Sequence, residues 1–128
     1  MENYTDLIAG IEQALAKAHE RKARLEQEIA RLEKEGIFDP IPTTSWETRG
    51  GKGRYLRLIF PTRPDGQRQR VYVGANARKI QAALDKIARS RRHEQLQRDL
   101  STLNNQLTQV LRSLRTLRLE LELAGWVT

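Results

Sequence analysis

Cysteine is absent from this chain of 128 residues. Its absence excludes disulfide frameworks, cysteine-ligated zinc and iron–sulfur sites, and thiol catalysis. Aromatic residues are also scarce, at 5% of the sequence, and apolar residues as a whole make up 38%. That composition is thin for a thick globular core but typical of amphipathic helices. We therefore expect a largely helical protein with a large surface for its length.

Long apolar segments are missing as well. No stretch of the chain approaches the roughly 18 uninterrupted apolar residues of a transmembrane helix. The first ten residues include Glu2 and Asp6 and lack both the basic leader and the apolar stretch of a signal peptide. The length suits one domain. The sequence therefore predicts a single-domain protein of the cytoplasm with no membrane span.

Side chains suited to catalysis are few and dispersed. His19 lies in a polar helical stretch and His93 in a run of arginines, with no second histidine at metal-ligand spacing and no nucleophile beside either. We expect both histidines at the surface. The acidic residues of the middle segment are scattered through turns and helix starts: Asp39, Glu47, Asp65 and Asp85. The sequence therefore predicts a protein with no enzymatic activity, no metal site and no cofactor.

An apolar seam is the clearest pattern in the first part of the chain. Its residues recur at alternating spacings of four and three, which is typical of a coiled-coil helix. The seam consists of Tyr4, Ile8, Ile11, Leu15, Ala18, Lys22, Leu25, Ile29, Leu32 and Gly36. Thr5 or Asp6 is the predicted N-cap, and Gly36 with two prolines soon after it predicts the end of the helix. We therefore expect a helix over residues 5–35.

A second seam with the same alternation lies near the other end of the chain. It consists of Leu96, Leu100, Leu103, Leu107, Val110, Leu114, Leu117 and Leu121. Two stripes of matched length predict an antiparallel pair of helices in which each stripe buries the other. Leu111 and Leu119 widen the second stripe and leave apolar surface for a second copy of the protein. We therefore expect a homodimer joined through these helices.

A β-hairpin is predicted between the seams. Residues 54–60 and 69–74 are short β-branched and aromatic runs, joined by a basic turn over 61–68. A period of two places one set of side chains on a buried face: Leu56, Leu58, Phe60, Val71 and Val73. The opposite face carries Tyr55, Arg57, Ile59, Arg70 and Tyr72. Whether residues 43–48 add a third edge strand is open, since a lone hairpin is only marginally stable.

A further helix is predicted after Gly74, with Asn76 as its cap. Its apolar stripe can cover the buried face of the hairpin and consists of Ile80, Leu84 and Ile87. This stripe does not run in phase into the later seam. The helix therefore either kinks at 89–94 or continues unbroken and changes the face that it buries. We favour the unbroken helix, which needs no break in the backbone.

Together these elements predict an α+β fold that is mostly α. Residues 1–36 form the first helix of an antiparallel two-helix coiled coil, and residues 94–128 form the return helix. Residues 37–93, the basic head, are inserted between the two helices and contain the β-hairpin with its covering helix. The three segments are predicted to form one structural unit.

Positive charge is concentrated in the basic head. Residues 37–93 hold thirteen Lys and Arg against four Asp and Glu, a net charge of +9, whereas residues 1–36 have a net charge of −2 and residues 94–128 of zero. Ten of the thirteen are arginine, which forms bidentate contacts with phosphate and guanine. A basic head on a near-neutral coiled coil is the pattern expected of nucleic-acid binding.

The exposed face of the hairpin carries the candidate contacts. Its tyrosines, interleaved with arginines, are suited to stacking on unpaired bases or to lying along a groove as a two-stranded ribbon. The alternative is an ordinary solvent face on which arginine packs against tyrosine by cation–π contact. The predicted nucleic-acid-binding residues are Lys52, Arg54, Tyr55, Arg57, Arg63, Arg68, Arg70, Tyr72, Arg78 and Lys79.

Two backbone segments are candidate phosphate sites. The segment 50–53, which contains Lys52, is either a mobile basic loop that becomes ordered on DNA or a plain flexible connector, and its spacing is not that of a P-loop. At the start of the later helix the amides of residues 77–79 are predicted to be free, beside Arg78 and Lys79. Such a clamp would hold a phosphate and read no sequence.

The order of elements in the head resembles the arm-type DNA-binding domains of phage and transposon integrases. The resemblance covers about residues 46–90 and rests on the glycine-rich basic lead, the run 55–60, the basic turn, the run 71–74 and the helix that follows. In those domains a small sheet lies against DNA with a helix packed behind it. The resemblance implies that three side chains face the DNA groove: Arg57, Arg70 and Tyr72.

The order helix, hairpin, helix is also similar to prefoldin-type chaperone subunits, in which hairpins assemble an oligomeric body and coiled coils project from it. The net charge of +9 on the head would oppose such assembly by edge pairing. The sequence therefore predicts a non-enzymatic nucleic-acid-binding protein, with DNA favoured over RNA, that acts as a homodimer. The alternative is an oligomeric coiled-coil scaffold or chaperone subunit.

Overall fold

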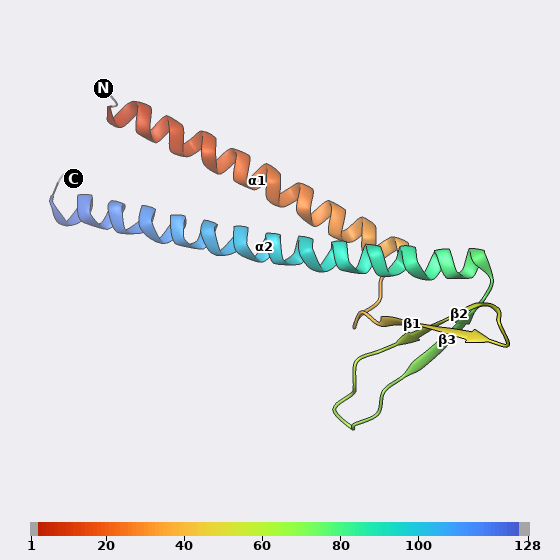
Figure 1. Cartoon of the computed structure of the whole chain (residues 1–128). Coiled ribbons are helices and arrows are strands. Elements are labelled where there is room, and N and C mark those ends of the chain that lie inside the picture. Colours follow the sequence, from red (N-terminus) through yellow and green to blue (C-terminus); the bar gives the residue numbers. More distant parts are fainter. Residues whose placement is uncertain (1–2, 126–128) are drawn as a thin grey trace. The chain divides into compact units, whose positions relative to one another are not determined.

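The computed structural model describes residues 3–125, apart from the side chains of Arg49 and Lys52. Five elements follow one another along the chain (Figure 1): α1 (Tyr4–Glu35), β1 (Thr43–Arg49), β2 (Lys52–Ile59), β3 (Arg70–Gly74) and α2 (Ala77–Leu123). Two long helices with a three-stranded antiparallel sheet between them confirm the predicted fold class, α+β and mostly α. No helix within residues 3–125 is long and apolar enough to cross a membrane.

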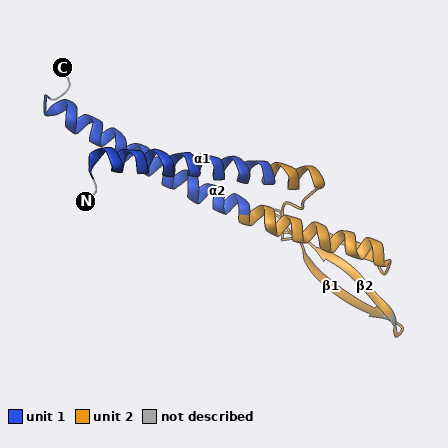
Figure 2. Ribbon diagram, turned by 90° about the horizontal axis from the view of Figure 1, so that it is seen from above, with its two compact units in different colours: residues 1–28, 96–128 blue, residues 29–95 orange. Residues whose placement is uncertain are grey.

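The chain divides into two compact units (Figure 2). Unit 1 consists of Met1–Glu28 and Leu96–Thr128, and unit 2 consists of Ile29–Gln95. Each helix contributes to both units, because the boundary crosses α1 after Glu28 and α2 before Leu96. In the described part of the chain, unit 1 is therefore built from helices, whereas unit 2 holds the sheet and the helical segments that pack on it.

The helix α1 begins at a side-chain cap and ends at a glycine. Oδ1 of Asn3 accepts the backbone N–H of Asp6 at 2.8 Å, so Asn3 is the N-cap and the predicted caps, Thr5 and Asp6, lie inside the helix. That prediction was wrong because all three residues have side chains suited to capping, and only backbone geometry selects one. At the other end Gly36 has φ 109°, a left-handed conformation that favours glycine.

In unit 1 the two helices run in opposite directions and face each other with the predicted seams (Figure 1). Leu25, Leu96 and Leu103 are buried there. Seam residues nearer the chain termini, such as Tyr4 and Leu121, are exposed. The two seams therefore bury each other over only part of their length.

The helix α2 is a single unbroken element of 47 residues. Its continuity confirms that the helix does not break at 89–94. Asn76 is the N-cap, as predicted. In unit 2 its first apolar stripe packs on the sheet through Ile80, Leu84 and Ile87. A straight helix can bury one face at its start and another farther along, because the two stripes are offset around the same axis.

The sheet of unit 2 has the order β1-β2-β3, and each neighbouring pair of strands is antiparallel. β1 is the third strand that the sequence left open, and its register places Trp46 opposite Leu56. β2 therefore lies in the centre of the sheet with a partner on both sides, whereas the hairpin predicted from the sequence alone would have left it as an edge.

A tight turn joins β1 to β2. Gly50 and Gly51 have φ angles of 58° and 69°, and Arg49 pairs with Lys52 on either side of them. Two successive residues with positive φ form the turn that matches the twist of an antiparallel hairpin, and glycine adopts that conformation without a steric penalty. The segment 50–53 therefore consists of a tight turn at Gly50 and Gly51 followed by the first residues of β2. The sequence did not predict this turn, because it joins β2 to a strand, β1, that the sequence left open.

The core of unit 2 lies between the sheet and α2. Leu56 and Leu58 of β2 are buried against Ile87 of α2, and the partly buried residues around them are Phe38, Ile41, Phe60, Val73, Ile80, Ala83 and Leu84. Val71, predicted to share this face, is 37% exposed. Val71 lies opposite Leu58 and so on the predicted face, but β3 is an edge strand and leaves Val71 partly exposed, whereas Val73 packs against the core.

Ser90 of α2 holds the segment that leaves α1. Its buried hydroxyl donates to the carbonyl of Lys86 at 2.6 Å and accepts the N–H of Phe38 at 2.8 Å. Beside it, Nε of Arg89 donates to the carbonyl of Gly36 at 3.0 Å. Backbone polar groups just after α1 therefore find their partners on α2.

We expect Ser90→Ala to lower the free energy of unfolding by about 1–3 kcal/mol, because the partly buried N–H of Phe38 would lose its acceptor. Urea denaturation followed by circular dichroism measures the change. Ser101→Ala, at an exposed position of the same helix, is the matched control and should stay within about 0.5 kcal/mol of the parent. Equal losses in the two variants would contradict the role given to Ser90.

Candidate nucleic-acid interface

The face of the sheet away from α2 carries two stacked tyrosines. The rings of Tyr55 on β2 and Tyr72 on β3 have centroids 6.2 Å apart and planes inclined by 21°. Tyr72 is 51% exposed and lies opposite Arg57 in the register. Alternation along the strands therefore brings these three predicted residues to one face, as expected. The pair presents an aromatic surface to solvent.

Arg57 is paired with a carboxylate. Its Nη2 lies 3.0 Å from Oε1 of Glu47 on β1, and the two side chains are 29% and 32% exposed. Nε of Arg57 is buried and makes no hydrogen bond in the structure. The prediction that Arg57 contacts nucleic acid considered only the β2–β3 hairpin, whereas β1 adds Glu47 to the same face. The charge of Arg57 is therefore balanced within the protein.

Arg54 lies against a tryptophan. Its guanidinium carbon is 4.5 Å from the ring centroid of Trp46 on β1. Arg54 is exposed, and the Trp46 ring is exposed in part. A cation–π contact of this kind is worth about 0.5–1 kcal/mol at an exposed site. Arg54 was predicted from the sequence as a contact residue, whereas Trp46 was not, because the strand over residues 43–48 that carries Trp46 was left open.

The loop between β2 and β3, residues 60–69, forms a hydrogen-bonded arm. The N–H of Arg63 donates to the carbonyl of Gln67 at 2.7 Å. At the tip Gly66 has φ 82°, and the carboxylate of Asp65 accepts the N–H of Gln67 at 2.9 Å. A loop tied in this way has few conformations to lose when a ligand binds, which lowers the entropic cost of binding.

Three exposed arginines belong to this arm and the strand after it: Arg63, Arg68 and Arg70. Nη2 of Arg63 donates to Oε1 of Gln69 at 3.1 Å, and Nε of Arg68 donates to the hydroxyl of Thr62 at 3.3 Å. Because a guanidinium has five N–H donors, each of these bonds orients the group and leaves other donors for a ligand. The arm therefore presents oriented cations to solvent.

The predicted phosphate clamp at the start of α2 is occupied. The N–H groups of Arg78 and Lys79 donate to Oδ1 of Asn76, at 3.0 and 3.1 Å. The prediction was wrong because a capping side chain takes up amides that a phosphate would need. The side chains of Arg78 and Lys79 are exposed and remain available as charges. Lys52 begins β2, and its side chain lies outside the described part of the structure.

His93 is buried rather than at the surface. It is 9% exposed, and its Nε2 lies 2.8 Å from Oε1 of Glu33 near the end of α1. The neighbouring arginines suggested a polar helix surface. In an unbroken helix, however, His93 lies three residues after Ser90 and three before Leu96, and both of these are buried. His19 is exposed, as predicted.

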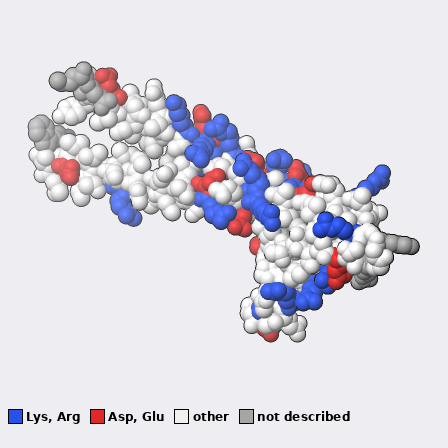
Figure 3. Space-filling view, in the orientation of Figure 1, with Lys and Arg blue, Asp and Glu red and all other residues white. Residues whose placement is uncertain are grey.

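Unit 2 carries the positive charge of the protein. Residues 29–95 include fifteen Lys and Arg and seven Asp and Glu, a net charge of +8, whereas unit 1 has eight and nine, a net charge of −1. On the face drawn in Figure 3, the helix ends that carry the chain termini are mainly uncharged. The exposed cations among the predicted contacts are Arg54, Arg63, Arg68, Arg70, Arg78 and Lys79.

Comparison with known proteins found no matching family model, no matching curated protein and no matching solved structure. The chemistry of the candidate interface therefore follows from its own residues. Exposed arginines and lysines bind anions, and the tyrosine pair offers a flat ring surface. Both kinds of group lie on unit 2.

Proposed function

We propose that unit 2 binds nucleic acid through the arm, strand β3 and the start of α2, as a non-enzymatic activity that needs no cofactor. The observation that carries this proposal is the separation of charge, with +8 on unit 2 and −1 on unit 1. Lys and Arg that neutralise phosphates release counterions from the nucleic acid, which favours binding. Solubility alone does not require basic residues to be collected on one unit.

In this proposal the exposed arginines contact phosphates and the tyrosines contact a base or sugar. Arg63, Arg68 and Arg70 lie along the arm and its junction with β3, where guanidinium groups can form bidentate bonds with phosphate oxygens. The exposed ring of Tyr72 offers a stacking surface. Arg57 has a different role, since its bond to Glu47 holds β1 and β2 together on this face.

DNA is the favoured ligand over RNA. The arm between β2 and β3 is closed by hydrogen bonds from the N–H of Phe60 to Gln69 and from the N–H of Arg63 to Gln67, and it continues past the last pair of β1 with β2, so it forms a two-stranded ribbon. The major groove of B-form DNA is about 12 Å wide and admits such a ribbon. The major groove of A-form RNA is deep and narrow, and side chains do not reach the bases there. The ribbon therefore suits duplex DNA better than duplex RNA.

We propose also that the protein acts in the cytoplasm as a homodimer joined through its helices. A chain without cysteine suits a reducing compartment. Exposed leucines on or beside the seam of unit 1, such as Leu111, Leu117 and Leu121, supply apolar surface for the contact between two copies. A dimer carries two basic heads, and binding of the first head raises the effective concentration of the second near the same nucleic acid.

Fluorescence anisotropy with labelled duplex DNA, single-stranded DNA and RNA, each titrated across a series of salt concentrations, tests the proposal. We expect the logarithm of the affinity for duplex DNA to fall linearly with the logarithm of the salt concentration. Affinity for RNA should be lower at every salt concentration. Absence of binding to all three ligands at low salt would overturn the proposal and favour the alternative, a coiled-coil scaffold with an acidic protein partner.

Glu47→Gln is expected to strengthen binding to duplex DNA by roughly 3-fold to 10-fold, because the charge of Arg57 would no longer be balanced. The slope of log affinity against log salt should become steeper by about 1, which corresponds to one additional phosphate contact. Glu12→Gln on the exposed surface of unit 1 removes the same charge and is the matched control, with no change expected. Equal gains from both variants would mean that net charge alone, and not Arg57, is responsible.

A further inference from the structure

Unit 1 exposes most of the large apolar side chains at the protein surface. Among residues 3–125, twelve such side chains are exposed, and nine of them belong to unit 1. Seven lie along or beside the two seams: Tyr4, Leu7, Ile8, Val110, Leu111, Leu117 and Leu121. A continuous apolar stripe of this kind on a folded protein marks a surface that another molecule covers.

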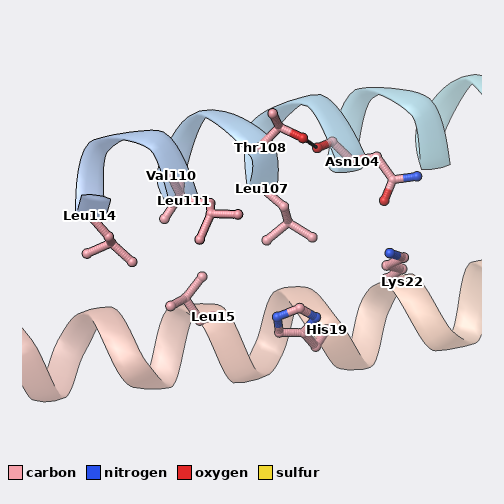
Figure 4. Close-up of a pocket in the computed structure, with 9 residues that line it drawn as sticks. All are labelled: Leu15, His19, Lys22, Asn104, Leu107, Thr108, Val110, Leu111 and Leu114. Atoms are coloured by element: carbon pink, nitrogen blue, oxygen red, sulfur yellow. Dashed lines mark hydrogen bonds between the residues drawn. The ribbon is translucent and has the colours of Figure 1, made fainter. Parts of the chain in front are cut away.

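The two seams border a groove in unit 1 (Figure 4). Its volume is about 440 Å³. Leu15 of α1 points toward Leu107 and Leu114 of α2, and all three are half-buried. His19 and Lys22 line the groove farther along α1. The groove is therefore apolar around Leu15, Leu107, Val110, Leu111 and Leu114, and polar around His19, Lys22, Asn104 and Thr108.

The spacing of the seams allows a second copy of the chain as the occupant. From Tyr4 to Lys22 the seam of α1 advances by four, three, four, three and four residues, and from Leu103 to Leu121 the seam of α2 advances by the same steps. Seams with these steps can pack on each other in parallel as well as antiparallel. Within one chain α1 and α2 run antiparallel (Figure 1). The parallel pairing therefore requires the α2 helix of a second copy.

We infer that a second copy of unit 1 fills the groove and forms a two-fold symmetric four-helix bundle, in which α1 of each copy runs parallel to α2 of the other. Tyr4 then lies opposite Leu103, and Ala18 opposite Leu117, of the second copy. Closed two-fold dimers are the commonest symmetric assembly, and helical hairpins bury their stripes well in such bundles. This inference rests on the proposed dimer but not on nucleic-acid binding.

Charge on the seam agrees with this register. Lys22 interrupts the apolar seam of α1, is half-buried, and forms no ion pair within the described residues. In the proposed bundle it lies opposite Leu121 of the second copy, between Glu120 and Glu122 in the last turns of α2. Those turns also carry the negative end of the helix dipole, which favours a cation. A basic residue in the seam thereby gains acidic neighbours.

Unit 1 has apolar side chains to form such a contact. A stable interface typically buries on the order of 800 Å² per partner. The seven exposed side chains, together with half-buried seam residues such as Ile11 and Leu114, supply the apolar part of that area. The centre of an interface is typically richer in apolar side chains than the rest of the surface.

Single cysteine variants test the orientation, since the parent chain has no cysteine. Ala18→Cys and Leu117→Cys are prepared separately, mixed, and oxidised. We expect the mixture to form a disulfide-linked pair of one chain of each kind. Each variant alone should remain unlinked. Ala18 and Gln106 of one chain line the same groove. In the proposed register Leu117 of the second copy therefore lies near Gln106, and the two copies of Leu117 are offset by about 11 residues, roughly 16 Å, which is too far for a disulfide.

Other cross-linking patterns would overturn the inference. Self-linking of Leu117→Cys would place the two copies of residue 117 next to each other, which the proposed register does not allow. A parent protein with the 14.8 kDa mass of one chain in sedimentation equilibrium would overturn both this inference and the proposed dimer. Nucleic-acid binding is measured separately by anisotropy, so its failure would leave the cross-linking result unaffected.

A pair of leucines on α2 provides a second test that does not depend on disulfide formation. Leu117 and Leu119 are 53% and 54% exposed, but Leu119 lies about 200° farther around the helix and off the seam. Leu117→Asp should raise the dimer dissociation constant about 100-fold or more, because the symmetric dimer would bury two unpaired carboxylates, one from each copy. Leu119→Asp should change it less than about 3-fold. Equal effects would place the interface elsewhere.

Discussion

Replacing Arg63, Arg68 and Arg70 by alanine is expected to weaken binding to duplex DNA about 100-fold or more near physiological salt. All three guanidinium groups are exposed and lie on the arm or where it enters β3. Removing three phosphate contacts should lower the slope of log affinity against log salt by about 3. Anisotropy titrations of the parent and the triple variant across the same salt series measure both quantities.

The matched control removes the same charge from unit 1. Lys17, Arg21 and Arg24 are exposed on α1, and alanine suits a helix surface. Their replacement should change the affinity less than about 3-fold. If the two triple variants lose affinity to the same extent, the interaction follows the net charge of the whole protein. In that case the arm is not the binding surface.

Leu56→Asp is expected to unfold unit 2. The Leu56 side chain is 0% exposed at the centre of the core formed by β2 and α2. A carboxylate there would have no partner, and the free energy of unfolding should fall by about 4 kcal/mol or more. That is most of the stability of a typical small domain. Unit 2 would then lose its cooperative unfolding transition.

Tryptophan fluorescence follows this transition from within the sheet. Trp46 lies opposite Leu56, and Trp126→Phe leaves it as the single tryptophan of the chain. Val71→Asp is the control, since it introduces the same charge at a position that is 37% exposed on the edge strand. Its effect should stay near 1 kcal/mol. A cooperative Trp46 transition retained in Leu56→Asp would contradict the assignment of the core.

The helices were predictable because their signal is local. The alternation of four and three residues predicted a helix over 5–35, and α1 spans Tyr4–Glu35. Asn76 was predicted as the cap of the later helix, and its Oδ1 does accept two backbone N–H groups. Signals of this kind depend on residues within one or two turns of each other, so a single sequence contains them in full.

The features that the sequence left open or predicted wrongly depend on residues that are far apart in the chain. Residues 43–48 became a strand only through pairing with β2, and that pairing turned the segment 50–53 into a tight turn. It also brought Glu47 to Arg57 and so balanced a charge that was expected to be available for a ligand. Strand propensity depends strongly on neighbouring strands and on burial, which a single sequence does not contain.

Periodicity and charge distribution were therefore sufficient to predict two helices, a hairpin and a basic middle segment. Each of these features depends on residues that are close in sequence. The state of individual side chains required the folded chain. His93 lies beside Glu33, and Ser90 accepts the N–H of Phe38, although each pair is more than fifty residues apart. Whether a polar group is buried or exposed depends on what the fold packs against it, and that is a property of tertiary structure.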